Sequence, residues 1–166
     1  ASGRGAAKYD LTVGDVRVRN VPTNIRTFDG GTDFDGNSIF VFEVGELCIA
    51  HLGHLHHPLE PGHLRALGRV DIVLFPVDGS YTLDQTGMLD VLKSIQARVM
   101  IPMHFFGGGT PSRFLARTQD IWPVERREHA GHAPGLHRLF ARRIALLRAF
   151  RDALRDRGEA EKAEGQ

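Results

Sequence analysis

Residues 70–77 read VDIVLFPV, and this stretch decides the fold. It is an apolar run of strand length without alternation, which is typical of a strand covered on both faces. A second apolar run, ARVMIPM at 97–103, follows a helical segment, QTGMLDVLKSIQ at 85–96, for which Asp84 is a plausible N-cap. Strand, helix and strand in this order predict two parallel strands joined by a right-handed crossover.

The segments before residue 70 add further strands to this unit. TVGDVRVRNVPT (12–23) alternates apolar and polar residues and is predicted as one half-buried strand, followed by a loop, FDGGTDFDGN (28–37). SIFVFEV (38–44) and ELCIAHL (46–52) are predicted to form a hairpin, and EPGHLRALG (60–68) a short helix. The order of these elements indicates an α/β fold.

The composition is that of an ordinary globular domain, with 42% hydrophobic residues, 25% charged residues and a formal net charge of +1. No segment approaches the run of about 18 apolar residues that a membrane span needs. The first ten residues also lack the apolar core of a secretory signal, so we expect a cytoplasmic protein without a membrane partner. Cys48 is the only cysteine, which excludes an intrachain disulfide and a cysteine-based zinc cluster.

The segment HLGHLHHPL (51–59) places four of the nine histidines directly after a predicted strand. Neutral imidazole is a common ligand for transition metals, and the carboxyl ends of parallel strands meet at one sheet edge. We therefore predict a metal site formed by His51, His54, His56, His57 and His104. The alternative is that these residues are surface histidines or hydrogen-bonded core histidines.

Asp78 follows the strand at 70–77 and precedes Gly79. It is interpreted either as a turn residue or as a functional one. In the second case it is a metal ligand, or an acceptor that orients a histidine.

Residues 125–166 differ from the rest and carry ten of the 21 Lys and Arg residues. We therefore divide the chain into a domain at 1–124 and a basic helical tail at 125–166. The near-neutral total charge argues against a nucleic-acid partner. An apolar stripe at helical spacing predicts a surface helix in the tail: Leu136, Phe140, Ile144, Leu147, Phe150 and Leu154.

Three stretches resemble the metallo-β-lactamase fold superfamily: GNSIFVFEVGELCIAHLGHL (36–55), LGRVDIVLFPVDGSYTLD (67–84) and VMIPMHF (99–105). They are most similar to the branch typified by L-ascorbate-6-phosphate lactonase and related Zn-dependent hydrolases. In that pattern, His54 stands where the bridging aspartate usually stands and His104 stands at the last metal-binding histidine. His57 matches a histidine often seen just after the aspartate. The resemblance implies Zn or another divalent transition metal as cofactor.

The sequence departs from the superfamily pattern before residue 51. The His-x-His-x-Asp-His loop of the superfamily's N-terminal half is not found there, and Asn24 and Ile25 stand near the place of a further histidine. The resemblance therefore implies the C-terminal half of the sandwich. The fold expected is a half or reduced metallo-β-lactamase-like αββα sandwich with a C-terminal helix.

Two functions remain open. The first is a metal-dependent hydrolase with a small-molecule substrate, in which metal-bound hydroxide attacks an ester, lactone or phosphoester. Asp78 would then orient a ligand or take a proton. The alternative is a non-catalytic metal-binding half-domain that is completed by a partner chain or a homo-oligomer. Because one sheet face needs a cover, we expect the N-terminal strands, the tail helix or a partner chain to lie on it.

Overall fold

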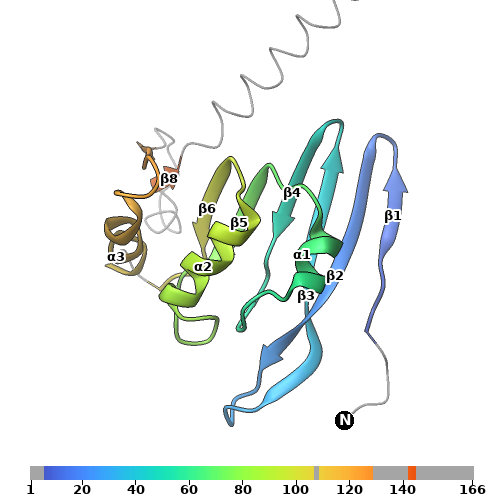
Figure 1. Cartoon of the computed structure of the whole chain (residues 1–166), viewed down its shortest axis with the longest axis horizontal. Helices are drawn as coiled ribbons and strands as arrows, with labels where there is room; N and C mark the ends of the chain where they lie inside the picture. Colours follow the sequence, from blue (N-terminus) through green and yellow to red (C-terminus); the bar gives the residue numbers. More distant parts are fainter. Residues whose placement is uncertain (1–5, 107–108, 129–141, 145–166) are drawn as a thin grey trace, which may run out of the picture. The chain divides into compact units, whose positions relative to one another are not determined.

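The structure is a computed structural model that describes residues 6–106, 109–128 and 142–144. The chain divides into two units, residues 1–117 and 118–166. The first contains a six-stranded sheet in the order β1-β2-β3-β4-β5-β6, with α1 and α2 over one face (Figure 1). These observations confirm the α/β class. In the described part of the chain, no helix is long and apolar enough to cross a membrane.

The sheet changes from antiparallel to parallel pairing at β4. β1, β2, β3 and β4 pair antiparallel in turn, whereas β4 with β5 and β5 with β6 are parallel. The parallel pair β5 and β6, on either side of α2, agrees with the strands predicted at 70–77 and 97–103. The elements are β1 (Asp10–Val13), β2 (Val16–Arg26), β3 (Thr32–Val44), β4 (Leu47–His51), α1 (Pro61–Leu67), β5 (Ile72–Pro76), α2 (Gln85–Ile95), β6 (Val99–Met103) and α3 (Gly109–Thr118).

The N-terminal strand predicted at 12–23 is in fact a hairpin. Gly14 has a φ of 61° and turns the chain, so that β1 pairs back onto β2. This left-handed backbone is accessible to glycine without a steric penalty. The predicted loop at 28–37 is also too long, because β3 already begins at Thr32 and pairs with Arg26 of β2.

The second unit departs from the predicted tail helix. Its described residues include β7 (Arg126–Glu128) and β8 (Arg142–Ile144), which pair antiparallel. The prediction is therefore wrong at Ile144, because its backbone pairs with Arg126 rather than within a helix. The predicted boundary after residue 124 falls inside this unit. The other stripe residues lie outside the described residues: Leu136, Phe140, Leu147, Phe150 and Leu154.

The two faces of the sheet differ in burial. The face beneath α1 and α2 is buried, as Ile39, Val41 and Val73 illustrate. The opposite face is apolar but only half-buried. There, Val18 and Ile49 are the cross-strand partners of Phe42 on either side, and all three are partly exposed. The expectation of cover on both faces therefore fails for β6, since every residue of that strand except Pro102 is partly exposed within the described structure.

We expect the full chain to self-associate through this open apolar face, because a large exposed apolar patch rarely persists on a soluble monomer. Light scattering over a concentration series should show the mean mass rising with concentration. Phe42→Glu should restore the monomer, whereas Phe34→Glu, at a ring that is 77% exposed at the other end of β3, should not. A wild-type chain that stays monomeric at every concentration would mean that another segment covers the face.

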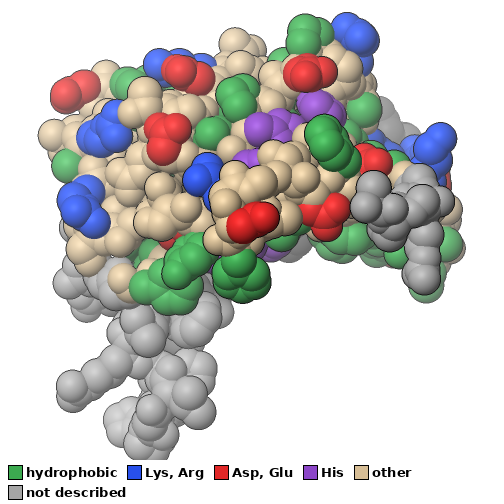
Figure 2. Space-filling view, turned by 90° about the horizontal axis from the view of Figure 1, so that it is seen from below, with side chains coloured by type: hydrophobic (Ala, Val, Ile, Leu, Met, Phe, Trp, Pro, Cys, Tyr) green, Lys and Arg blue, Asp and Glu red, His purple; other side chains and the backbone are tan. Residues whose placement is uncertain are grey.

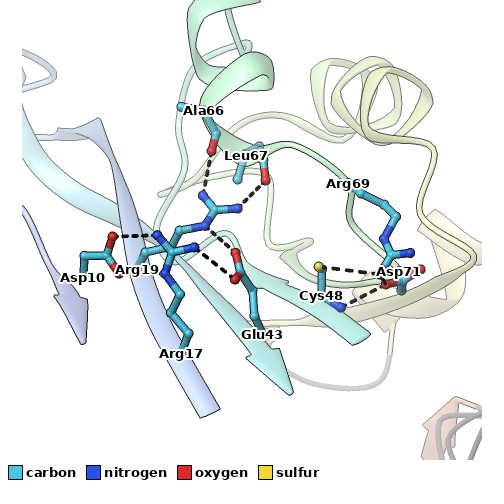
Figure 3. Close-up of polar contacts among 9 residues, drawn as sticks. All are labelled: Asp10, Arg17, Arg19, Glu43, Cys48, Ala66, Leu67, Arg69 and Asp71. Carbon is cyan, nitrogen blue, oxygen red and sulfur yellow. Dashed lines mark hydrogen bonds and ion pairs between the residues drawn. The ribbon is translucent and has the colours of Figure 1, made fainter. Parts of the chain in front are cut away.

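Arg19 of β2 ties the sheet to α1. Its Nη1 and Nη2 donate to the carbonyl oxygens of Ala66 and Leu67, both at 2.6 Å, and its Nε donates to Glu43 Oε1 at 2.7 Å (Figure 3). The guanidinium thus satisfies carbonyls at the C-terminal end of the helix, where cations are favoured. The neighbouring Arg17 makes ion pairs with Asp10 and Glu43, but its side chain is 45% exposed against 18% for Arg19.

Arg19→Ala is expected to lower the free energy of unfolding by about 2–3 kcal/mol, because half-buried hydrogen bonds of a charged group are lost together. Arg17→Ala should cost less than about 1 kcal/mol, since exposed ion pairs contribute little. Urea unfolding of both variants tests this. Equal losses would show that the α1 contact of Arg19 does not stabilise the fold.

Candidate metal centre

Three side chains that are distant in sequence meet at the carboxyl ends of β4, β5 and β6. His54 Nε2 lies 2.6 Å from His104 Nε2, and His104 Nδ1 lies 3.1 Å from Asp78 Oδ1. Figure 2 views the molecule from this edge, and histidine side chains gather there. The predicted convergence of His54 and His104 at one sheet edge is thus what the structure shows.

Asp78 is held as an anion by the turn that follows it. Its side chain is 3% exposed, and its carboxylate accepts the backbone N–H groups of Ser80, Tyr81 and Thr82 and the Thr82 hydroxyl. Burial alone would raise the pKa of Asp78. The hydrogen bonds from Thr82, Tyr81 and Ser80 outweigh burial and lower this pKa to about 2. Asp78 is therefore ionised at neutral pH, and the turn-residue and orienting interpretations both apply.

This carboxylate fixes the tautomer of His104. An ionised carboxylate can only accept, so His104 Nδ1 donates to Asp78 and the lone pair of the neutral ring lies on Nε2. His104 itself has a φ of 52°, an uncommon conformation for a residue other than glycine. Burial, followed by the charge of His104, lowers the pKa of His54, which favours the neutral ring.

The pair fits two positions of a metal shell. Two nitrogens bound tetrahedrally to one zinc ion at about 2.0–2.1 Å are about 3.3 Å apart, so the rings need to separate by less than about 1 Å. A carboxylate on the far nitrogen of a histidine is a common support for a metal ligand. However, no group of three or more His, Cys, Asp or Glu suited to an ion occurs among the described residues. The described part of the chain therefore offers at most this pair as candidate ligands, whereas a zinc centre needs at least three ligands.

The structure does not bring His51, His56 and His57 to this pair. His57 Nδ1 donates to Pro58 O at 2.7 Å and its Nε2 accepts the Asn24 N–H at 3.1 Å, so neither nitrogen has a lone pair left for an ion. His56 Nδ1 donates to Asn24 O at 3.0 Å. His51 Nδ1 accepts the backbone N–H of Gly53 at 3.2 Å. His56 and His57 thus fasten the loop to β2.

Sequence reasoning missed the residues that position His54. Asn37 is 8% exposed, accepts the His54 N–H at 2.8 Å, and donates to Thr23 Oγ1 and Leu52 O at 2.7 and 3.2 Å. Gly53 has a φ of 61°, and a Cβ there would lie 2.4 Å from Asn37 Oδ1. Polar residues inside apolar strand segments, as at Thr23 and Asn37, are the signal that could have revealed this support.

Comparison with known proteins places this chain in a family. Residues 5–104 match the family model described as the beta-lactamase superfamily domain. A UPF0173 protein of Pyrococcus abyssi is 32% identical over 78 residues, covering 46% of this chain and 36% of the relative. A UPF0173 metal-dependent hydrolase of Thermoplasma acidophilum is 32% identical over 92 residues, covering 54% and 40%. The chain thus spans well under half of these relatives.

Solved structures agree. A metallo-β-lactamase superfamily protein of Thermotoga maritima, whose structure bears the name of a Zn-dependent hydrolase, is 31% identical with a TM-score of 0.54. The match covers 69% of this chain and 57% of that one. A metallo hydrolase of Ignicoccus hospitalis shares the fold, with a TM-score of 0.52 and 17% identity. The match covers 71% of this chain and 52% of that one. The chain therefore belongs to the beta-lactamase superfamily domain family, as the resemblance in its sequence implies.

Proposed function

We propose that this chain forms part of the metal centre of a metal-dependent hydrolase. The observation that carries the proposal is the convergence of His54 Nε2 and His104 Nε2 at one sheet edge, with Asp78 behind His104. The names of the relatives from Thermoplasma acidophilum and Thermotoga maritima support it. The substrate class proposed is a small molecule with an ester, lactone or phosphoester bond.

Each residue has a separate task in this proposal. Asp78 keeps the lone pair of His104 on Nε2, and Asn37 holds the backbone of His54 through the 2.8 Å hydrogen bond. His54 and His104 would bind the ion. A divalent metal such as Zn²⁺, when bound, supplies a Lewis acid that activates water for hydrolysis at neutral pH. Asp78 acts as an orienting group rather than a base, because its hydrogen bonds lower its pKa to about 2 and make the carboxylate a weak proton acceptor at neutral pH.

A second function is favoured by the count of ligands. Since the described residues supply two, the remaining ligands come from outside them or from a partner chain. In this alternative, the chain is a non-catalytic metal-binding half-domain, and activity requires the partner.

Metal-dependent hydrolysis distinguishes the two functions. The full chain is stripped with a chelator, reloaded with Zn²⁺ or Mn²⁺, and assayed with 4-nitrophenyl acetate, a γ-lactone and bis(4-nitrophenyl) phosphate. The hydrolase function predicts turnover that appears with metal and disappears with chelator. Metal binding without turnover would favour the half-domain. A chain that binds no metal in elemental analysis would overturn both.

A further inference from the structure

Two large exposed rings stand beside His104. Tyr81 is 57% exposed and Phe106 is 74% exposed. Their ring centroids are 6.4 Å apart at an interplanar angle of 74°, and Phe106 lies 5.7 Å from the His104 ring at 80°. These distances are those of edge-to-face aromatic pairs. The two rings therefore form a single aromatic pair that adjoins the candidate metal centre.

Both rings are positioned by the same residues that build the centre. The backbone N–H of Tyr81 donates to Asp78 Oδ2 at 2.7 Å, and Phe106 follows His104 by two positions in the chain. Tyr81 thus lies in the turn that anchors the carboxylate, and Phe106 lies against the imidazole that this carboxylate orients. This fixes where the two rings stand relative to the His54–His104 pair.

Other exposed aromatic residues lack this relation. Phe28 lies in the turn between β2 and β3 and is 107% exposed, and Phe34 lies near the start of β3 and is 77% exposed. No aromatic contact within the described residues joins them to His54 or His104. Exposed apolar side chains that occur singly need no explanation, whereas paired rings beside a polar centre are typical of binding sites. Phe34 is therefore a suitable control residue.

The ring faces and edges decide which ligand group fits beside the centre. Among the ion pairs of the described residues, the partner of Asp78 is His104. A planar apolar group needs only ring faces and edges, which Tyr81 and Phe106 present.

We propose that Tyr81 and Phe106 form a platform that binds an aromatic group of the substrate next to the scissile bond. This deepens the proposed hydrolase function and rests on it. The substrate class is then an ester or phosphoester with an aryl or similarly flat apolar substituent. The ring of that substituent would pack against Phe106 and Tyr81 while the bond to be cleaved lies toward His54 and His104.

Binding is tested first, without metal and without turnover. Benzyl alcohol is titrated into the metal-free full chain, and its affinity is measured by ligand-observed NMR. Phe106→Ala and Tyr81→Ala are each expected to weaken binding about three- to tenfold, the range of one aromatic pair. Both changes keep the backbone, including the Tyr81 N–H bond to Asp78. Phe34→Ala should leave the affinity unchanged. Equal affinity in the wild type and all three variants would overturn the platform.

Turnover is tested second, on the metal-loaded full chain. Phe106→Ala should raise KM for phenyl acetate about three- to tenfold, and should lower kcat/KM for phenyl acetate by a larger factor than kcat/KM for ethyl acetate. Equal losses for both esters would mean that Phe106 supports the metal centre instead, which would overturn the specificity role. A third result is a wild type without turnover, while Phe106→Ala and Tyr81→Ala still bind benzyl alcohol more weakly than the wild type. That result would overturn the hydrolase function and leave the binding platform standing.

Discussion

His104→Ala is expected to lower the affinity of the chain for Zn²⁺ by about 100-fold or more. Loss of a residue that supports a ligand typically costs 10–100-fold in metal affinity, so loss of a ligand should reach at least the upper end of that range. His54→Ala should have a similar effect, because its Nε2 faces that of His104 at 2.6 Å. Elemental analysis and competition with a zinc indicator measure both affinities.

The control variants come from the same histidine-rich region. His57→Ala removes a ring whose two nitrogens are occupied by Pro58 and Asn24. His63→Ala removes a ring whose Nδ1 accepts the Glu60 N–H at the start of α1. Both variants should keep a zinc affinity within about threefold of the wild type. Neither ring has a free nitrogen lone pair beside His54 and His104, so neither can act as a metal ligand there.

Asp78→Asn gives an intermediate case. The amide has nearly the size of the carboxylate but carries an NH2 donor as well as an acceptor oxygen, so it no longer forces the proton of His104 onto Nδ1. Zinc affinity should fall about 10–100-fold, less than for His104→Ala. Equal metal retention in His54→Ala, His104→Ala, His57→Ala and wild type would show that the proposed centre does not exist.

The sequence predicts the parallel half of the sheet well because that half depends on local patterns. The apolar runs at 70–77 and 97–103 flank a helix that begins after its N-cap Asp84, whose side chain accepts the Thr86 and Gly87 N–H groups. The antiparallel half was less predictable. The chain turns at Gly14, where the spacing of the apolar residues changes from two to three between Val13 and Val16, and the prediction of a single strand overlooked this change.

The site was predictable in part for a similar reason. His54 and His104 could be paired because each follows a strand that ends at the same sheet edge. The roles of His56 and His57 could not be inferred, because both bind the backbone of Asn24, 32 and 33 residues away, on β2. Backbone groups leave no trace in residue type. The sequence therefore shows which side chains are able to bind metal, but not which of them are already occupied.

Gly53→Ala is expected to destabilise the fold by about 2–5 kcal/mol, the sum of backbone strain and one lost buried hydrogen bond. At a φ of 61°, a side chain costs about 1–2 kcal/mol in backbone strain. The new Cβ would also lie 2.4 Å from Asn37 Oδ1, so Asn37 must leave its place and give up the His54 N–H. A buried donor or acceptor without its partner adds about 1–3 kcal/mol.

Gly14→Ala is the matched control for Gly53→Ala. Gly14 has the same φ of 61°, but nothing lies within 4 Å of the added Cβ. It should therefore cost only the strain of about 1–2 kcal/mol. Urea unfolding of the two variants measures the difference, which reports the contacts of the new Cβ with the Asn37 side chain and, at 3.1 Å, the Ser38 carbonyl oxygen. Zinc affinity should also fall in Gly53→Ala and stay unchanged in Gly14→Ala, because only the former displaces His54. Equal destabilisation by the two substitutions would mean that Asn37 moves away without a loss of free energy of unfolding. Asn37 would then not hold the loop that carries His54.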